Sequence, residues 1–148
     1  MENISFKKIV ISYFITSVLI FFISAAANAA GVFGNSMSTR MDSMSIELFT
    51  ILQLILVLLA NSVLHLIFYY GGFSASPILR GVGIGAFLGL SYFIFSAFAL
   101  NVYDIHGESM VDLTAAMSGR MIEYAAGGIA TAMISVSDIH RWGILRAF

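Results

Sequence analysis

The sequence predicts an all-α integral membrane protein in which four transmembrane helices form one bundle. Of its 148 residues, 59% are hydrophobic and only 10% are charged, whereas a soluble domain carries roughly 25% charged residues. Four hydrophobic segments are each long enough to cross a bilayer, which takes about 20 residues. They are apolar all round rather than along one stripe, and they lack the alternating pattern of a membrane β-barrel.

The first expected span covers residues 9–30 and ends in ISAAANAAG. Within that stretch, Ala27-Asn28-Ala29 is the A-x-A step of a signal-peptide cleavage site. A leader cut after Ala29 and an uncleaved helix both fit these residues. The apolar run of about 21 residues exceeds the 7–15-residue core of a signal peptide, which favours the uncleaved helix.

The other expected spans cover residues 46–70, 81–103 and 114–136. Short linkers separate them, and neither an internal repeat nor a low-complexity tract interrupts the chain. We therefore expect a single membrane domain over residues 1–148.

The distribution of Lys and Arg predicts the orientation, because cytoplasmic loops carry the excess of positive charge. With a cytoplasmic N-terminus and four spans, the cytoplasmic side holds Lys7, Lys8, Arg80, Arg141 and Arg146, and the opposite side holds Arg40 and Arg120. Both termini are therefore expected in the cytoplasm, with the protein in a bacterial inner membrane. Cleavage after Ala29 would leave the sidedness of the other spans unchanged.

Small residues at helical spacing predict where the helices pack, because small side chains allow membrane helices to approach closely. These residues are Gly81, Gly85 and Gly89 in the third span, and Ala126, Ala130, Gly128 and Ala132 on two ridges of the fourth. We expect the third and fourth spans to pack tightly against each other.

Two polar residues of the second span, Asn61 and His65, share one helix face because they are four residues apart. A histidine inside a membrane can ligate haem or bind a quinone. The commoner role is a hydrogen bond between helices, which we favour. A haem held by two histidines is disfavoured because His106 and His140 fall outside the spans.

The fourth span contains Arg120 and Glu123, whose i,i+3 spacing allows them to pair on one face. Ionisable residues inside a membrane are costly and are commonly functional. The favoured interpretation is an ion pair near the interface, with Arg120 extended toward the lipid headgroups.

Methionines gather on the non-cytoplasmic side of the expected topology. Met37, Met41 and Met44 would share one face of a helical linker, and Met110 and His106 belong to the next linker on that side. Thioethers are soft ligands that select Cu(I), so copper is one candidate cofactor. Packing of flexible apolar side chains against a partner is the favoured alternative, in which case no cofactor is expected.

Composition argues against several other functions. The chain has no cysteine and a net charge of -1, which excludes thiolate chemistry and gives no electrostatic support for nucleic-acid binding. Hydrolase, P-loop and zincin motifs are missing from the sequence. We therefore expect a protein that is not an enzyme.

The layout of the first half also resembles a known group of proteins. A leader-like segment ends in ANAAG, a helix follows, and the turn GGFSASP leads into a glycine-rich helix. This order resembles the small pilin-like and membrane subunits of type IV secretion and conjugation machines. The fourth span and the linker NVYDIHGESMVDL depart from the two-span pilin pattern. The resemblance implies a structural subunit without catalytic residues.

Together these observations predict a small structural or accessory subunit of a larger inner-membrane assembly. Its expected partners are the lipid bilayer and other membrane subunits, including further copies of itself. Two alternatives remain open: a protein that handles Cu(I) or another ion, and an immunity protein against a pore-forming toxin.

Overall fold

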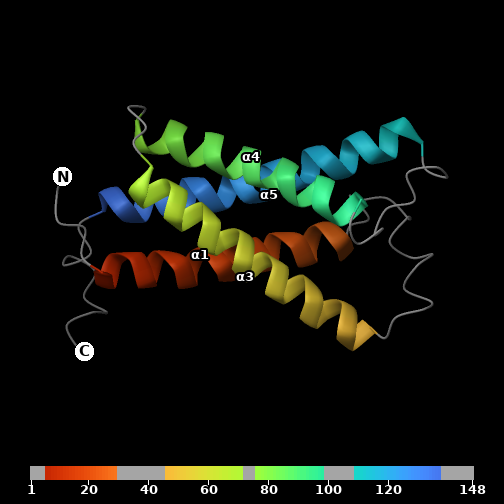
Figure 1. Cartoon of the computed structure of the whole chain (residues 1–148), viewed down its shortest axis with the longest axis horizontal. Coiled ribbons are helices and arrows are strands. Elements are labelled where there is room, and N and C mark those ends of the chain that lie inside the picture. The colour runs from red at the N-terminus through yellow and green to blue at the C-terminus, as the bar shows by residue number, and fades with distance from the viewer. Residues whose placement is uncertain (1–5, 30–45, 72–75, 99–108, 138–148) are drawn as a thin grey trace.

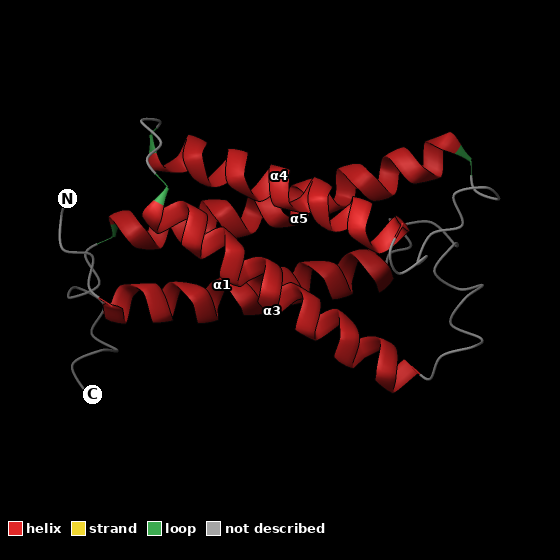
Figure 2. Cartoon of the chain, in the orientation of Figure 1, coloured by secondary structure: helices red, strands yellow, loops and turns green. Residues whose placement is uncertain are grey.

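The computed structural model describes residues 6–29, 46–71, 76–98 and 109–137, and all regular structure in these ranges is α-helical. The helices are α1 (Phe6–Ala29), α3 (Ile46–Tyr70), α4 (Pro77–Phe98) and α5 (Met110–Val136). They lie alongside one another in an elongated bundle (Figures 1 and 2). By length and composition, α1, α3 and α4 can each cross a membrane.

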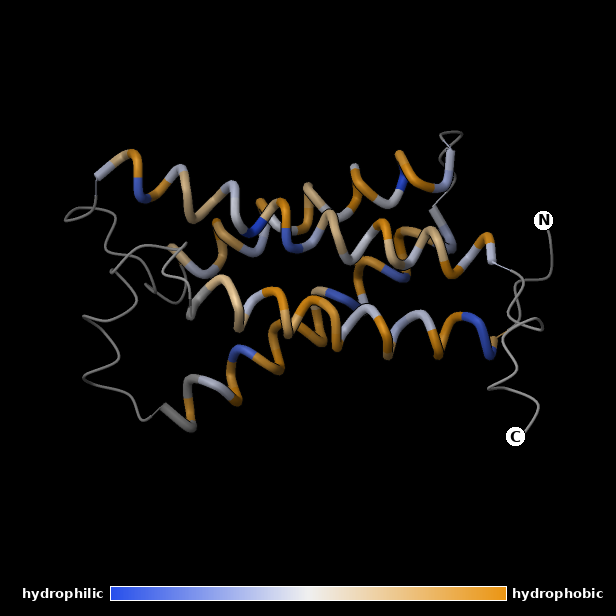
Figure 3. The backbone as a smooth tube through the Cα atoms, turned by 180° about the vertical axis from the view of Figure 1, so that it is seen from behind, coloured by the Kyte–Doolittle hydropathy of each residue, from blue (hydrophilic) through white to orange (hydrophobic). Residues whose placement is uncertain are grey.

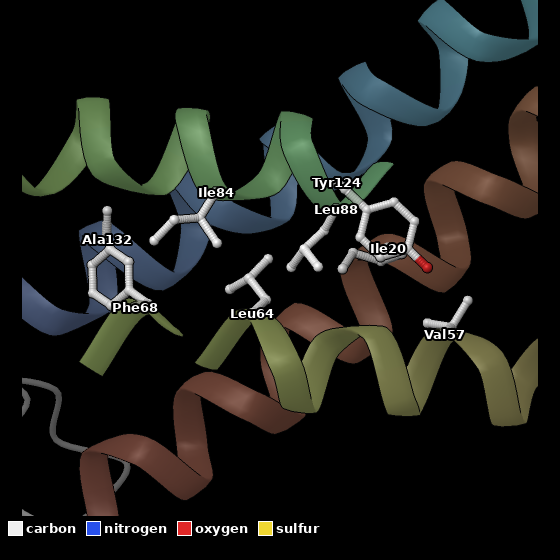
Figure 4. Packing of buried hydrophobic residues seen from close by; sticks show 8 residues of the cluster. All are labelled: Ile20, Val57, Leu64, Phe68, Ile84, Leu88, Tyr124 and Ala132. Atoms are coloured by element: carbon white, nitrogen blue, oxygen red, sulfur yellow. The ribbon is translucent and has the colours of Figure 1, made fainter. Parts of the chain in front are cut away.

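The four helices form a closed ring of neighbours. α1 contacts α3 and α5, and α4 contacts the same two helices. One hydrophobic cluster at the centre of the ring takes residues from all four helices (Figure 4). Its buried members are Ile20, Val57, Leu64, Phe68, Ile84, Leu88, Tyr124 and Ala132.

Three helices begin earlier than the hydrophobic segments predicted, and α1 begins at Phe6 rather than at residue 9. α4 begins at Pro77 rather than at residue 81, since proline has no backbone N–H to leave unpaired in a first turn. α5 begins at Met110 rather than at residue 114 because Ser109 caps it. The Ser109 hydroxyl oxygen accepts from the Asp112 backbone N–H at 3.2 Å, and the hydroxyl donates to the Asp112 carboxylate at 2.7 Å.

α4 and α5 pack backbone against backbone along the glycine row. A Cβ atom added to Gly85 would lie 2.7 Å from the carbonyl carbon of Tyr124 and 2.8 Å from the Cα atom of Ala125. Gly89 faces the Arg120 backbone with the same closeness, and Gly81 faces Gly128. Glycine is therefore required along this contact, because any side chain would meet main-chain atoms.

The small residues of α5 divide between its faces. Gly128 and Ala132 are buried toward α4, whereas Ala126 and Ala130 are only partly buried. Gly127 faces α1, where an added Cβ would lie 2.7 Å from Cδ1 of Ile20. The ridge of Gly128 and Ala132 thus serves the contact with α4, and Gly127 lets α1 approach.

An arginine near the start of α4 bonds to the end of α3. The Arg80 guanidinium donates to the carbonyl oxygen of Gly71 and lies 5.1 Å from the centre of the Phe68 ring. A cation at this position interacts favourably with the negative, C-terminal end of the α3 helix dipole. Arg80 therefore joins the end of α3 to the start of α4.

The polarity of the bundle is inverted relative to that of a soluble protein. Large apolar side chains are exposed on every helix, among them Phe14, Leu59, Phe87 and Ile122. Figure 3 shows hydrophobic residues along all four helices. The most deeply buried side chains include Arg120, Glu123 and Asn61. This arrangement is typical of a helical bundle whose surroundings are lipid.

Candidate functional site

Polar side chains in the interior gather in two groups at different levels of the bundle. The first, the Arg120 cluster, consists of Ser24, Gln53, Tyr92, Arg120 and Glu123. The second, the Asn61 cluster, consists of Ser12, Tyr13, Ser17, Asn61 and His65. The first draws on all four helices, and the second joins α1 to α3.

The Arg120 cluster is built on an ion pair within α5. Nη1 of Arg120 lies 2.8 Å from Oε2 of Glu123, and both side chains are 1% exposed. The structure therefore places Arg120 in the bundle interior. It does not extend toward the headgroup level, as the favoured interpretation of the sequence had it.

A serine on α1 connects this ion pair to α3. The Ser24 hydroxyl oxygen accepts a hydrogen bond from Arg120 at 2.8 Å and a second from the amide nitrogen of Gln53 at 2.8 Å. The Arg120 guanidinium also lies 5.2 Å from the centre of the Tyr92 ring on α4. One cationic side chain thus holds contacts to α1 and α4 directly, and to α3 through Ser24.

The charges of this pair are compensated within the bundle. An isolated charge in a low-dielectric interior is very costly, and removing one partner of a buried pair typically costs about 3–5 kcal/mol. Here the cation has a carboxylate, a hydroxyl and an aromatic face within reach. Arg120 therefore has a structural role in connecting helices, because its guanidinium is bonded to groups of the protein itself.

The Asn61 cluster joins α3 to the other half of α1. The Asn61 amide nitrogen donates to the Ser17 hydroxyl oxygen at 2.6 Å and to the Tyr13 carbonyl oxygen at 3.0 Å. The Tyr13 hydroxyl donates back to the Leu58 carbonyl at 3.0 Å. These bonds set the register of α1 against α3.

His65 makes hydrogen bonds with both of its ring nitrogens. Nδ1 lies 2.9 Å from the carbonyl oxygen of Asn61, which can only accept, so Nδ1 carries the hydrogen in the neutral ring. Nε2 then accepts from the Ser12 hydroxyl at 3.0 Å. Since neither nitrogen is left over in this arrangement, His65 acts as a contact between helices and is not placed to ligate a haem.

A serine beside a histidine also raises the question of nucleophilic catalysis. Ser12 lies inside α1, where its own backbone N–H belongs to the helix, and its side chain is fully buried. It therefore offers neither an oxyanion-binding N–H nor an open approach for a substrate. The geometry of this pair is that of a structural hydrogen bond.

The polar row on α1 was not recognised from the sequence. Ser12, Thr16 and Ser24 are separated by multiples of four residues, so they lie on one face, and all three are buried. Thr16 meets Thr131 of α5 at 3.1 Å between the hydroxyl oxygens. The i+4 spacing of hydroxyl residues in an otherwise apolar segment was the signal that could have identified this face.

The methionine hypothesis falls mostly outside the described part of the chain. Met37, Met41, Met44 and His106 lie outside the described residues. Met110 begins α5 and is 81% exposed. Among the residues that the structure describes, no three His, Cys, Asp or Glu side chains gather as metal ligands.

Comparisons with known proteins do not assign this chain to a family. No protein-family model, curated protein or solved structure matches this chain.

Proposed function

We propose that the chain is a small, non-enzymatic, four-span protein of the bacterial inner membrane, acting as a structural or accessory subunit of a larger assembly. The observation that carries the proposal is the inverted polarity of the bundle. Side chains of the Arg120 and Asn61 clusters form bonds between helices in the interior, while large apolar side chains are exposed on the outside. What the bundle presents along its length is therefore a surface for lipid and for apolar helices of other subunits.

The proposal takes α5 as the fourth span. The composition of α5 is less apolar than that of the other helices, since it contains Arg120 and Glu123. Both of these side chains are buried, at 1% exposure each, so lipid does not meet their charges. α5 also lies between α1 and α4, which are themselves long and apolar enough to cross a membrane.

Four spans place both chain ends on one side of the membrane. Arg120 no longer counts toward a loop, because it is buried inside the bundle. The Lys and Arg asymmetry then becomes stronger, with Arg40 alone on the side opposite Lys7, Lys8 and Arg80. This asymmetry supports cytoplasmic termini.

The proposal also retains α1 as a permanent part of the bundle. Ser12, Thr16, Ser17 and Ser24 each bond to a side chain on α3 or α5. Removal of α1 would leave Asn61, His65 and Arg120 without these partners in the apolar interior. Such losses cost about 1–3 kcal/mol for each buried group, which supports an uncleaved helix.

Photo-crosslinking in native membranes tests the subunit role. A benzoylphenylalanine placed at the exposed Leu59 of α3 should crosslink the chain to another protein. The same group at the buried Leu64, 0% exposed, is the matched control and should give crosslinks within the chain only. Native mass spectrometry after mild detergent extraction should then show the crosslinked partner in a complex. The proposal would be overturned if the Leu59 probe formed no crosslink to another protein and native mass spectrometry showed only a monomer. A type IV secretion or conjugation apparatus is the assembly that the segment layout suggests.

A further inference from the structure

Two adjacent lysines, Lys7 and Lys8, occupy the first turn of α1. Lys7 is exposed and Lys8 is partly buried. Neither lysine is paired with a carboxylate among the residues that the structure describes. Within this part of the chain, both charges are therefore left for a partner from outside the bundle.

The position of these lysines is unfavourable for the helix itself. The start of a helix is the positive end of its dipole and favours acidic residues, whereas cations are favoured in the last turn. α1 has no acidic residue in its first turn, while α5 has Asp112 there. None of the four described helices has a basic residue in its last turn. Helix stability therefore does not explain why the two lysines lie at this end.

The end of the bundle where α1 begins carries further positive charge. Figure 1 shows that α1 and α4 begin at the same end, where α3 and α5 end. Arg80 lies in the first turn of α4 and adds a third cation, and α4 also lacks an acidic residue in that turn. The described residues at this end contain no Asp or Glu. The charge of this end is therefore complementary to an anionic surface.

Lys7 also lies at the head of an exposed apolar stripe, which consists of Val10, Phe14 and Val18. These residues follow Lys7 at intervals of three and four, so all four share one face of α1. The three apolar side chains are 49%, 70% and 40% exposed. From Lys7 to Val18 the helix rises by about 16 Å, close to half of the ~30 Å hydrocarbon thickness of a bilayer. The stripe thus has the length of one leaflet, with a charge at its end.

A phospholipid with a negatively charged headgroup matches this arrangement. Its phosphate is complementary to the lysines, and its acyl chains are complementary to the apolar stripe. A nucleic acid or an acidic soluble protein would meet the charge but not the stripe. A phospholipid without net charge would meet the stripe but not the charge.

We propose that the start of α1 binds an anionic phospholipid, with the headgroup on Lys7 and Lys8 and one acyl chain along the apolar stripe. Basic residues beside membrane spans attract anionic lipids in this way. Arg80 adds to the potential at this end, although its guanidinium is bonded to Gly71. The inference rests on the membrane placement proposed above and does not depend on the subunit role.

Lipid titration of the purified full chain in detergent tests the proposal, with bound lipids counted by native mass spectrometry. The probes are phosphatidylglycerol, which is anionic, and phosphatidylcholine, which has no net charge. The unmodified protein should bind phosphatidylglycerol more tightly. Each basic residue near an anionic surface contributes about fivefold to the association constant. Lys7→Gln combined with Lys8→Gln should therefore weaken phosphatidylglycerol binding about 25-fold and leave phosphatidylcholine binding unchanged.

The matched control is Lys7→Arg combined with Lys8→Arg, which keeps both charges and should retain the preference for phosphatidylglycerol. Equal binding of the two lipids by the unmodified protein would overturn the proposal. An unchanged preference after the Gln substitutions, or a lost preference after the Arg substitutions, would overturn it as well.

Failure of the membrane placement gives a separate result. The chain would then be recovered in the soluble fraction of lysed cells, which would overturn the lipid site together with the placement. A chain that stays in the membrane fraction but binds the two lipids equally would refute the lipid site alone.

Discussion

The contact between α4 and α5 makes the sharpest prediction about stability, because α4 carries a glycine that touches α5 and one that does not. An added Cβ at Gly85 would meet main-chain atoms of α5 at 2.7 and 2.8 Å, whereas an added Cβ at Gly83 would have nothing within 4 Å. The change Gly→Ala is the same at both positions, and both lie inside one helix. The difference between the two variants therefore isolates the cost of separating α4 from α5.

The magnitude follows from the distances. An added Cβ at Gly85 would lie closer still to the Tyr124 carbonyl oxygen than to its carbonyl carbon at 2.7 Å, so reaching the ordinary 3.4 Å requires the helices to separate by at least about 0.7 Å. A gap of that size forfeits roughly a quarter to a half of the dispersion energy of the atoms along the contact. Overpacking of this kind costs about 1–3 kcal/mol. Gly83→Ala should instead be neutral or stabilising by up to about 1 kcal/mol, through helix propensity.

SDS titration of the purified protein in mixed micelles measures both free energies of unfolding. We expect Gly85→Ala to be less stable than Gly83→Ala by about 2 kcal/mol or more. Gly89→Ala should behave like Gly85→Ala, because it meets the Arg120 backbone in the same way. Equal stability of the Gly83 and Gly85 variants would refute the backbone contact.

Three further predictions concern the ion pair, the cap of α5 and the first helix. Arg120→Leu and Glu123→Leu should each destabilise the bundle by about 3–5 kcal/mol, because each leaves an unpaired buried charge. The double variant should be more stable than either single variant, since no unpaired charge remains. Additive losses of stability in SDS titration would contradict the burial of the pair. Ser109→Ala should cost about 1 kcal/mol by loss of the cap on α5. Ser91→Ala, at an exposed serine inside α4, serves as the control, and equal values for the two would argue against the cap. Intact mass and N-terminal sequencing of protein purified from membranes should show that α1 is retained, and a mature chain that starts at Ala30 would mean that α1 is removed as a leader.

Much of the helical architecture could be predicted from the sequence because it depends on local patterns. Long apolar runs indicate the helices, and the i+4 spacing of Gly81, Gly85 and Gly89 indicates a close helix contact. The helix starts were less well predicted, since Pro77 and Ser109 act through capping and backbone geometry at polar residues just outside the hydrophobic runs.

The interior bonds could not be predicted in the same way. Ser24 and Arg120 are 96 residues apart, and Ser12 and His65 are 53 residues apart. Periodicity describes one helix at a time and does not tell which partner each polar face will meet. For this reason Arg120 was expected at the headgroups, although the Ser24 hydroxyl and the Tyr92 ring hold it inside the bundle.

The four-span topology is the central claim, and accessibility of single cysteines tests it most directly. The chain has no native cysteine, so each variant carries one reporter thiol. Ser76→Cys precedes α4, Ser109→Cys precedes α5 and Ser137→Cys follows α5. In cells with a permeabilised outer membrane, a membrane-impermeant maleimide should label the cysteine at position 109. Labelling at 76 and 137 should require disruption of the inner membrane. Labelling at 109 and 137 from the same side would contradict α5 as the fourth span.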